Sequence, residues 1–462
     1  MNLLLERIVG EWNRFLWGPG MLVFYIGVGL ILTWRTRFFQ VRYFGKSLRL
    51  VLRGMTPKKE KGKNGISAFQ AVATALAGTM GVGNIAGAAA AIAAGGAGAI
   101  FWMWVSAFFG MMTKCAEAIL AVQYRDEEGS SRCGGPMYYI SRGLGMRWMA
   151  VLYAVLCLAA CFGVGSLTPA GEVAGVLEGL GMPGGWSGVI MAGLCAVVIC
   201  GGMKRVGKVS EWVIPILSLF YILFAAAAIL MRLPALPGAV RRIFEEAFCL
   251  RAAGGGVLGM GMIRAMRIGL ARGVYTNEAG MGSSAIAHAV SEEEEPVRQG
   301  MLGIFEVFLD TFVITALTAL VVLTAEEGMG ASALTGGGAV MAAEAFSVSF
   351  GKAGESFVAV SMFCFALPSM FGWASYGEKS LEYLLKKETV RKKGRGIFRL
   401  LFCAAVMVGA VANTRLVWGI ADVFNGLMAI PNLTALVFLS GKVVKAVKRY
   451  EKAGTGAAVR SR

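Results

Sequence analysis

Long apolar segments separated by short polar ones dominate this chain. Apolar stretches of about 20 residues, the length a helix needs to cross a hydrocarbon layer about 30 Å thick, recur as far as residue 440. The pattern therefore predicts an all-α membrane protein with about 11 transmembrane helices. These spans lie at residues 15–34, 66–93, 97–122, 149–177, 187–203, 209–231, 247–273, 299–324, 356–383, 396–414 and 416–440.

Two of the spans are rich in glycine. Residues 77–87 read AGTMGVGNIAG and residues 252–261 read AAGGGVLGMG. Glycine-interrupted segments at corresponding places in two halves indicate broken helices around a transporter binding site. When the first span is set aside, these segments begin two halves of five spans each, and an odd number of spans gives the halves opposite orientations. The sequence thus predicts a five-plus-five inverted repeat with two broken helices.

The same pattern divides the chain into four parts without a linker between soluble domains. Residues 1–65 hold the extra N-terminal helix and a basic loop, residues 66–231 the first repeat, residues 232–440 the second, and residues 441–462 a basic tail. We expect one polytopic unit.

Composition and charge agree with a membrane location. The chain of 462 residues is 56% hydrophobic and 16% charged, with mean hydropathy +0.65, whereas soluble domains carry about 25% charged residues. The net charge of +17 suggests nucleic acid, but the basic residues lie in the loops. With the loop at residues 35–65 inside, 36 Lys and Arg fall on the cytoplasmic side and 8 outside. The positive-inside rule then predicts a cell-membrane protein with the N-terminus outside and the C-terminus in the cytoplasm. Its expected surroundings are lipid, with no nucleic-acid partner.

Four acidic residues lie within the predicted spans, where a charge is costly and often functional. They are Asp310 and Glu306 in the eighth span, Glu172 in the fourth and Asp422 in the last. Two interpretations stay open for them. They either carry a cation or a proton, or they form helix–helix hydrogen bonds near an interface.

The remaining charged features point to local structure. Lys114 and Glu117 are three residues apart, a spacing that favours a local pair, and His288 is the single histidine, expected to cap or pack a loop. The nine cysteines show no metal or disulfide spacing. No catalytic cluster is recognisable, so the sequence does not predict an enzyme.

A broken helix suits a charged solute and an ion. Freed N–H groups and a helix N-terminus favour a carboxylate, while freed carbonyls favour a hard cation such as sodium. A zwitterionic amino acid bound with a cation satisfies both kinds of group. The pattern therefore favours a cation-coupled carrier over a passive channel, which needs a continuous polar pore and no coupling.

Longer motifs are similar to those of the alanine/glycine:cation symporter family. The matching segments are residues 78–125, which begin GTMGVGNIAG, GGPMYYI at 134–140, ARGVYTNEAGMGSSAIAHA at 271–289, GWASYGEKSLEYL at 372–384 and IADVFNGLMAIPNL at 420–433. The resemblance implies a LeuT-type five-plus-five fold with one extra N-terminal helix. It also implies import of alanine or glycine with co-transported sodium by alternating access. A related carrier of different amino-acid specificity, or one driven by protons, is the alternative, and the oligomeric state stays open.

The resemblance also implies a set of site residues. Trp373 would close over the small side chain of the substrate, and Pro368 and Ser369 stand where the family usually has Ser-Thr. In the seventh span, Met260-Gly261 also stands where the family usually has Ser-Thr, and Arg264 stands where it usually has Gln. The substrate would contact Thr79, Gly81, Gly83, Asn84, Phe162, Gly165, Gly256, Gly259 and Trp373. Sodium would be held by the carbonyls of Ala77 and Met80 and by Phe365 and Ser369. Asp310, whose charge lies within a span, is a further candidate for a sodium ligand.

Overall fold

The computed structural model describes residues 2–55, 65–128, 131–248, 257–329, 334, 337–385, 387–412 and 414–460. Almost all of them are helical. The first half of the chain contains α1 (Asn2–Leu16), α2 (Pro19–Arg35), α3 (Phe39–Arg42), α4 (Phe44–Gly54), α5 (Ala68–Thr79), η1 (Val82–Asn84), α6 (Ala86–Gly95), α7 (Gly98–Gln123), α8 (Pro136–Tyr138), η2 (Tyr139–Gly143), α9 (Arg147–Phe162), η3 (Gly163–Leu167), α10 (Thr168–Gly179), α11 (Gly184–Ile199) and α12 (Gly202–Met231).

The second half continues in the same manner. It contains η4 (Leu233–Ala235), α13 (Leu236–Ala247), α14 (Val257–Asn277), α15 (Ala285–Ala289), α16 (Pro296–Val307), η5 (Phe308–Thr315), α17 (Ala316–Met329), α18 (Ala339–Phe350), α19 (Lys352–Leu384), α20 (Glu388–Val411) and α21 (Thr414–Arg460). A hairpin of β1 (Asp126–Glu128) and β2 (Ser131–Cys133) pairs antiparallel and follows α7.

Membrane-spanning helices are confirmed as the main building block. Within the described residues, eight helices are long and apolar enough to cross a bilayer, and α5 with α6 forms a ninth, bent by 59° at its break. The shorter apolar helix α11 occupies the predicted span at residues 187–203. Helix α18 is also apolar but was not predicted. The number of eleven spans and the inverted repeat stay predictions.

The predicted seventh span ends four residues too early, and the part of its glycine run that the structure describes, residues 257–261, is helical; residues 252–256 lie outside the described residues. Helix α14 is continuous from Val257 to Asn277, so residues 257–261 do not form a break. The chain leaves helical geometry only after Asn277 and resumes at α15. Arg264, Arg267 and Arg272, which were counted among the 36 cytoplasmic residues, belong to this helix. Without these three the cytoplasmic count is 33, which still far exceeds 8.

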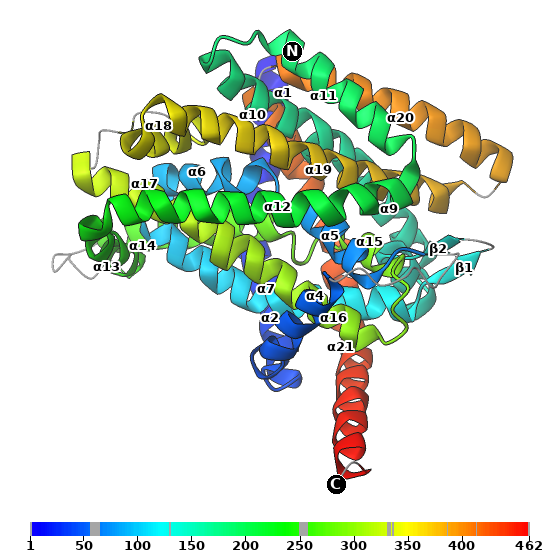
Figure 1. Cartoon of the computed structure of the whole chain (residues 1–462). Coiled ribbons are helices and arrows are strands. Elements are labelled where there is room, and N and C mark those ends of the chain that lie inside the picture. The colour runs from blue at the N-terminus through cyan, green and yellow to red at the C-terminus, as the bar shows by residue number, and fades with distance from the viewer. Residues whose placement is uncertain are drawn as a thin grey trace.

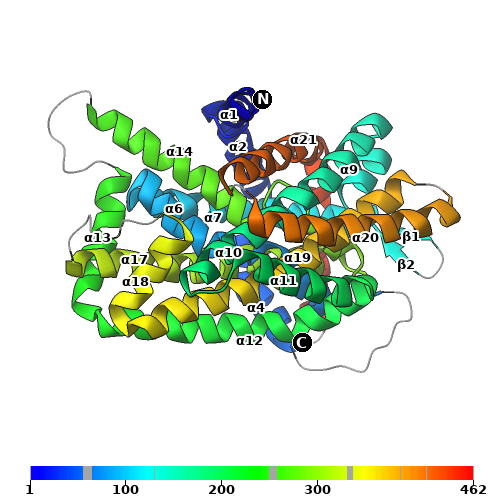
Figure 2. The ribbon, with the colours of Figure 1, turned by 90° about the horizontal axis from the view of Figure 1, so that it is seen from above.

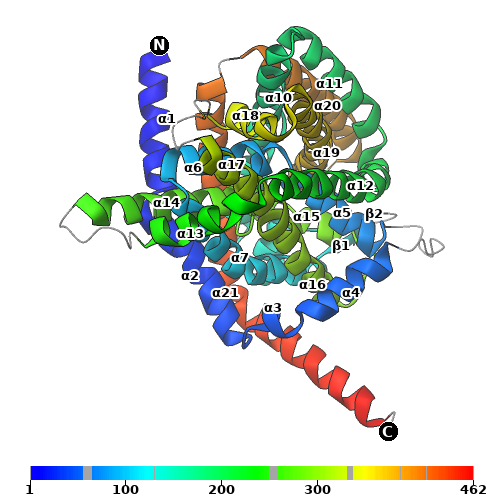
Figure 3. The ribbon, with the colours of Figure 1, turned by 60° about the vertical axis from the view of Figure 1, so that its left-hand side comes forward.

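The N-terminal helices pack along the last helix. Asn13 donates to the carbonyl of Gly419 (2.9 Å), and the indole of Trp17 donates to the carbonyl of Asp422 (3.2 Å). Seen from above, α1, α2 and α21 lie together along one side of the molecule and α12 lies along the opposite side (Figure 2). The C-terminal part of α21 projects from the bundle, and the chain ends lie at opposite ends of the molecule (Figures 1 and 3).

Candidate functional site

The first break, between α5 and α6, frees backbone carbonyls. In an unbroken helix the N–H of Gly81 would bond Ala77, and that of Asn84 would bond Met80. Here the N–H of Gly81 donates to the carbonyl of Thr79 (3.0 Å) and to Oδ1 of Asn84 (3.1 Å). The N–H of Asn84 donates to the carbonyl of Gly81 (3.4 Å). The carbonyls of Ala77 and Met80, both expected to hold sodium, have therefore lost these helical donors.

Helix α19 brings a hydroxyl to the same place. Ser369 Oγ donates to the carbonyl of Gly78 (3.1 Å), and a Cβ on Gly372 would lie only 3.1 Å from the Cα of Gly78. Phe365, one turn before Ser369, is buried. Pro368 sits inside the helix and cannot donate an N–H, so the helix loses one hydrogen bond to an upstream carbonyl. The structure thus places the Ser369 hydroxyl at the first break.

Asp310 joins the first break to a π-helix. It lies in η5, is fully buried, and its Oδ1 accepts a hydrogen bond from Nδ2 of Asn84 (2.6 Å). Its other oxygen accepts from Thr311 Oγ1 (2.9 Å), to which Asn277 at the end of α14 also donates (3.3 Å). Hydrogen bonds therefore connect the first break, Asp310 and the end of α14. Isolated π-helical turns often occur at functional sites.

The second break lies between α14 and α15. Three of its residues have positive φ: Glu278 (54°), Gly280 (96°) and Gly282 (76°). Glycine adopts this region without steric cost, whereas Glu278 is strained there. The alternating glycines of the NEAGMG motif are a sequence signal that could have located this break, whereas the described part of the denser glycine run, residues 257–261, is helical.

Two predicted substrate residues, Gly256 and Gly259, come from the glycine-rich run at 252–261. Gly256 lies outside the described residues. Gly259 is in the first turn of α14, 18 residues before Asn277, which corresponds to roughly 27 Å along the helix. The structure therefore does not bring Gly259 together with the break.

Side chains from three other helices bond the backbone freed at the second break. Glu117 Oε1 accepts from the N–H of Gly280 (3.0 Å), Asn432 Nδ2 donates to its carbonyl (2.8 Å), and Tyr153 donates to the carbonyl of Met281 (3.1 Å). Unpaired backbone groups within a membrane are costly, so such partners stabilise a permanent break.

A buried chain of charged and polar side chains, Lys114, Glu306, His288 and Gln299, lies beside α15; it is called the buried charged chain below. Lys114 Nζ lies 3.2 Å from Glu306 Oε1 and 2.8 Å from Ser284 Oγ, so it pairs with Glu306 and the expected pair with Glu117 is wrong. His288 Nε2 lies 3.0 Å from Glu306 Oε2, and its Nδ1 lies 2.7 Å from Nε2 of Gln299. Lys114, Glu306 and His288 are completely buried. The chain ties the segment after the second break to α7 and α16.

The other two acidic residues each accept a hydrogen bond from a tryptophan indole. Glu172 Oε1 accepts from the indole of Trp418 (2.7 Å), which is the helix–helix interpretation. Asp422 is contacted through its backbone by Trp17.

Trp373 connects the second break to the π-helix η3. Its indole donates to Glu278 Oε1 (3.1 Å), and the side chain is completely buried. A Cβ on Gly165 would lie 2.5 Å from the Cβ of Trp373, so this glycine permits the contact. Phe162 instead packs on Phe398 of α20, with ring centroids 5.6 Å apart, so its ring is not brought to the breaks.

Thr79 and Gly83, two further predicted substrate residues, both lie at the first break. Thr79 ends α5 and its hydroxyl donates back to the carbonyl of Ala75 (3.3 Å). A Cβ on Gly83 would lie 3.7 Å from Cγ2 of Thr276 in α14. The two broken helices therefore lie against each other here.

The sequence did not identify Glu278, Asn277 and Glu117 as site residues, because their hydrogen-bond partners in other segments are far away in the chain.

Comparison with known proteins agrees with this geometry. A model of the sodium:alanine symporter family matches residues 1–459. The chain belongs to the sodium:alanine symporter family. It is 39% identical over 453 residues to the sodium/alanine symporter AgcS of Methanococcus maripaludis, covering 96% of this chain and 97% of that protein. It is 35% identical over 457 residues to the probable sodium/glutamine symporter GlnT of Bacillus subtilis, covering 98% and 92%.

A solved structure agrees on the fold of this sodium:alanine symporter family member. The crystal structure of MhsT in complex with L-phenylalanine superposes with a TM-score of 0.59 at 12% identity, covering 84% of this chain and 99% of that one. At this identity the likeness shows the fold alone, which is LeuT-type. The family to which the chain belongs is a family of transporters.

Proposed function

We propose that this protein imports a small amino acid, alanine or glycine, together with sodium by alternating access. The observation that carries the proposal is the first break. There the carbonyls of Ala77 and Met80 have lost their helical donors beside the hydroxyl of Ser369. Oxygen donors of this kind suit a hard cation. The family supplies the class of transport, and the relative AgcS is named a sodium/alanine symporter.

The proposed substrate site lies between the two breaks. Asn84 and Gly83 belong to the first break, and Trp373 reaches Glu278 at the second. The large buried indole and its contact with Gly165 favour a substrate with a short side chain. Asp310 is proposed as a further sodium ligand, because its carboxylate hydrogen bonds to Asn84.

The alternative is a related carrier of different specificity or coupling. One relative is named a probable sodium/glutamine symporter at 35% identity. Asp310 and Glu306 are both fully buried acids that could carry a proton.

We further propose that the protein lies in the plasma membrane with its N-terminus outside and its C-terminus in the cytoplasm. A cysteine at position 445 labelled by an impermeant thiol reagent in intact cells would contradict that orientation.

A binding screen tests the proposal. Purified protein is titrated with alanine, glycine and glutamine in sodium chloride and, separately, in potassium chloride, with thermal stability as the measurement. Alanine and glycine should stabilise the protein in sodium, and the apparent affinity should fall at least about tenfold in potassium. Equal stabilisation in both salts contradicts sodium coupling, and stabilisation by glutamine alone contradicts the substrate.

A further inference from the structure

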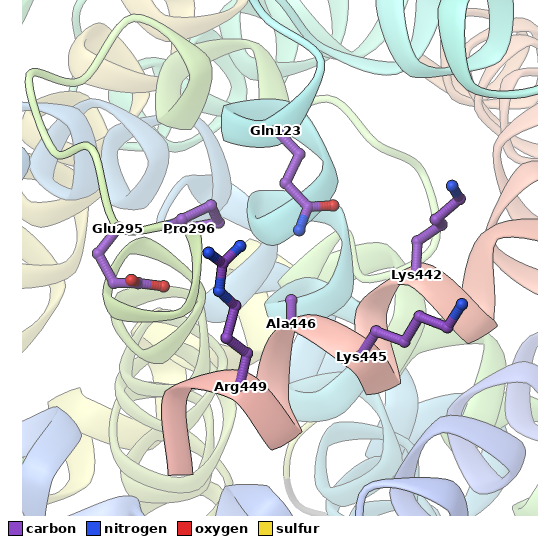
Figure 4. A pocket seen from close by; sticks show the side chains of 7 residues that line it. All are labelled: Gln123, Glu295, Pro296, Lys442, Lys445, Ala446 and Arg449. Carbon is purple, nitrogen blue, oxygen red and sulfur yellow. The ribbon is translucent and has the colours of Figure 1, made fainter. Parts of the chain in front are cut away.

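A pocket lined by three cations lies where three helices meet. It has a volume of about 360 Å³ and lies between the end of α7, the start of α16 and the C-terminal part of α21 (Figure 4). Its lining residues are Gln123, Glu295, Pro296, Lys442, Lys445, Ala446 and Arg449. None of them belongs to the breaks or to the buried charged chain, so the transport site does not use this pocket.

The three cations share one face of α21. Lys442, Lys445 and Arg449 are spaced three and four residues apart, which aligns them on one side of a helix. All three are exposed, and within the part of the chain that the structure describes none forms an ion pair. Figure 4 shows their side chains on the pocket side of α21.

The opposite face of α21 is fixed to the body of the protein. Arg35 donates to Ser440 (2.5 Å), and Arg42 pairs with Glu451 (2.8 Å). Ser440 and Glu451 are about 11 residues, or three helical turns, apart, so both lie on one face. The helix is therefore held in place, and the cationic face is presented to a ligand without rearrangement.

The pocket lies at a membrane boundary. Gln123 is the last residue of one candidate span and Pro296 the first of another, so both helices enter the bilayer here. The apolar sequence of α21 ends just before Lys442. Lipid phosphates occupy this depth, and Lys and Arg near the end of a membrane helix attract anionic headgroups.

We propose that this pocket binds the headgroup of an anionic glycerophospholipid of the phosphatidylglycerol type. Lys442, Lys445 and Arg449 contact the phosphodiester, for which arginine offers two parallel donors. Glu295 is the one carboxylate in the lining, and its Oε1 already accepts the N–H of Val297 (3.3 Å). It would repel a second anionic charge but accepts hydrogen bonds from headgroup hydroxyls. This selects a singly charged phosphodiester that carries hydroxyl groups.

The test uses short-chain lipids on the full-length protein in detergent. Dihexanoyl-phosphatidylglycerol, dihexanoyl-phosphatidylcholine and inorganic phosphate are titrated separately by calorimetry. The test variant is Lys442→Gln/Lys445→Gln/Arg449→Gln. The matched control is Lys392→Gln/Lys393→Gln/Lys448→Gln, which removes three exposed cations outside the pocket.

Wild-type protein and the control should bind phosphatidylglycerol at least about tenfold more tightly than phosphatidylcholine. The test variant should lose at least about tenfold in phosphatidylglycerol affinity. The single changes Lys445→Gln and Arg449→Gln should each weaken it severalfold and serve if the triple variant does not fold. Equal loss in test and control variants overturns the pocket. Equal binding of inorganic phosphate overturns the choice of lipid, and equal binding of phosphatidylcholine overturns the anionic headgroup.

Discussion

At the scale of single residues, buried polar groups are matched one to one across distant parts of the chain. Asn84 pairs with Asp310, Trp373 with Glu278, and Lys114 with Glu306. A buried charge whose partner is removed is strongly destabilising, whereas loss of both partners is far less so. Comparing variants that lack one partner with variants that lack both therefore separates the effect of a pair on stability from its effect on transport.

The Lys114–Glu306 pair gives a direct prediction. Lys114→Met leaves the Glu306 carboxylate buried with only His288 beside it, which costs about 3–5 kcal/mol of stability. Adding Glu306→Gln removes that unpaired charge and should restore most of the loss. The melting temperature of the purified variants measures this. A double variant as unstable as Lys114→Met would show that the pair does not set stability.

Sequence reasoning reached some of these residues and missed others for a physical reason. Ser369 and Asn84 were implied by the resemblance to the symporter family, and the structure has both at the first break. Lys114 was assigned to Glu117 because the two are neighbours on one helix turn. The actual partner, Glu306, follows 192 positions later, and only the packing of α7 against α16 brings it within 3.2 Å.

At the scale of helices, the two breaks differ in how they are built. The first lies in a span whose sequence contains a capping box: Ser67 accepts from the N–H of Gln70 and so begins α5. The second is held open by Glu117, Asn432 and Tyr153 from other helices. Glycine density predicted the first break, which the structure shows, but it did not predict the break after Asn277, and α14 accommodates Gly259 and Gly261 in a regular helix.

The first break offers a pair of matched variants. A Cβ on Gly83 meets Thr276 at 3.7 Å, an ordinary contact, so Gly83→Ala should bind and transport. Gly83→Leu adds three more carbons between the broken helices and should abolish alanine binding while the protein still inserts. Radiolabelled alanine uptake, normalised to the amount in the membrane, measures both. Wild-type uptake by Gly83→Leu would remove Gly83 from the site.

At the scale of the whole molecule, the apolar pattern predicted the helical membrane architecture because bilayer thickness fixes the length of each span. Helices below that length were harder to assign, as α18 and the bounds of α14 demonstrate.

The distribution of charge is also a property of the whole molecule. Basic residues concentrate on one predicted side, where the α21 pocket lies, and the two broken helices meet inside the bundle.

Accumulation of alanine in proteoliposomes tests the central claim, sodium-coupled symport, most directly. Vesicles containing the purified protein are given an inward sodium gradient at equal pH or, separately, an inward proton gradient without sodium. We predict that alanine rises above its outside concentration only under the sodium gradient, and that a sodium ionophore abolishes the rise. Accumulation that persists unchanged without sodium would contradict the account.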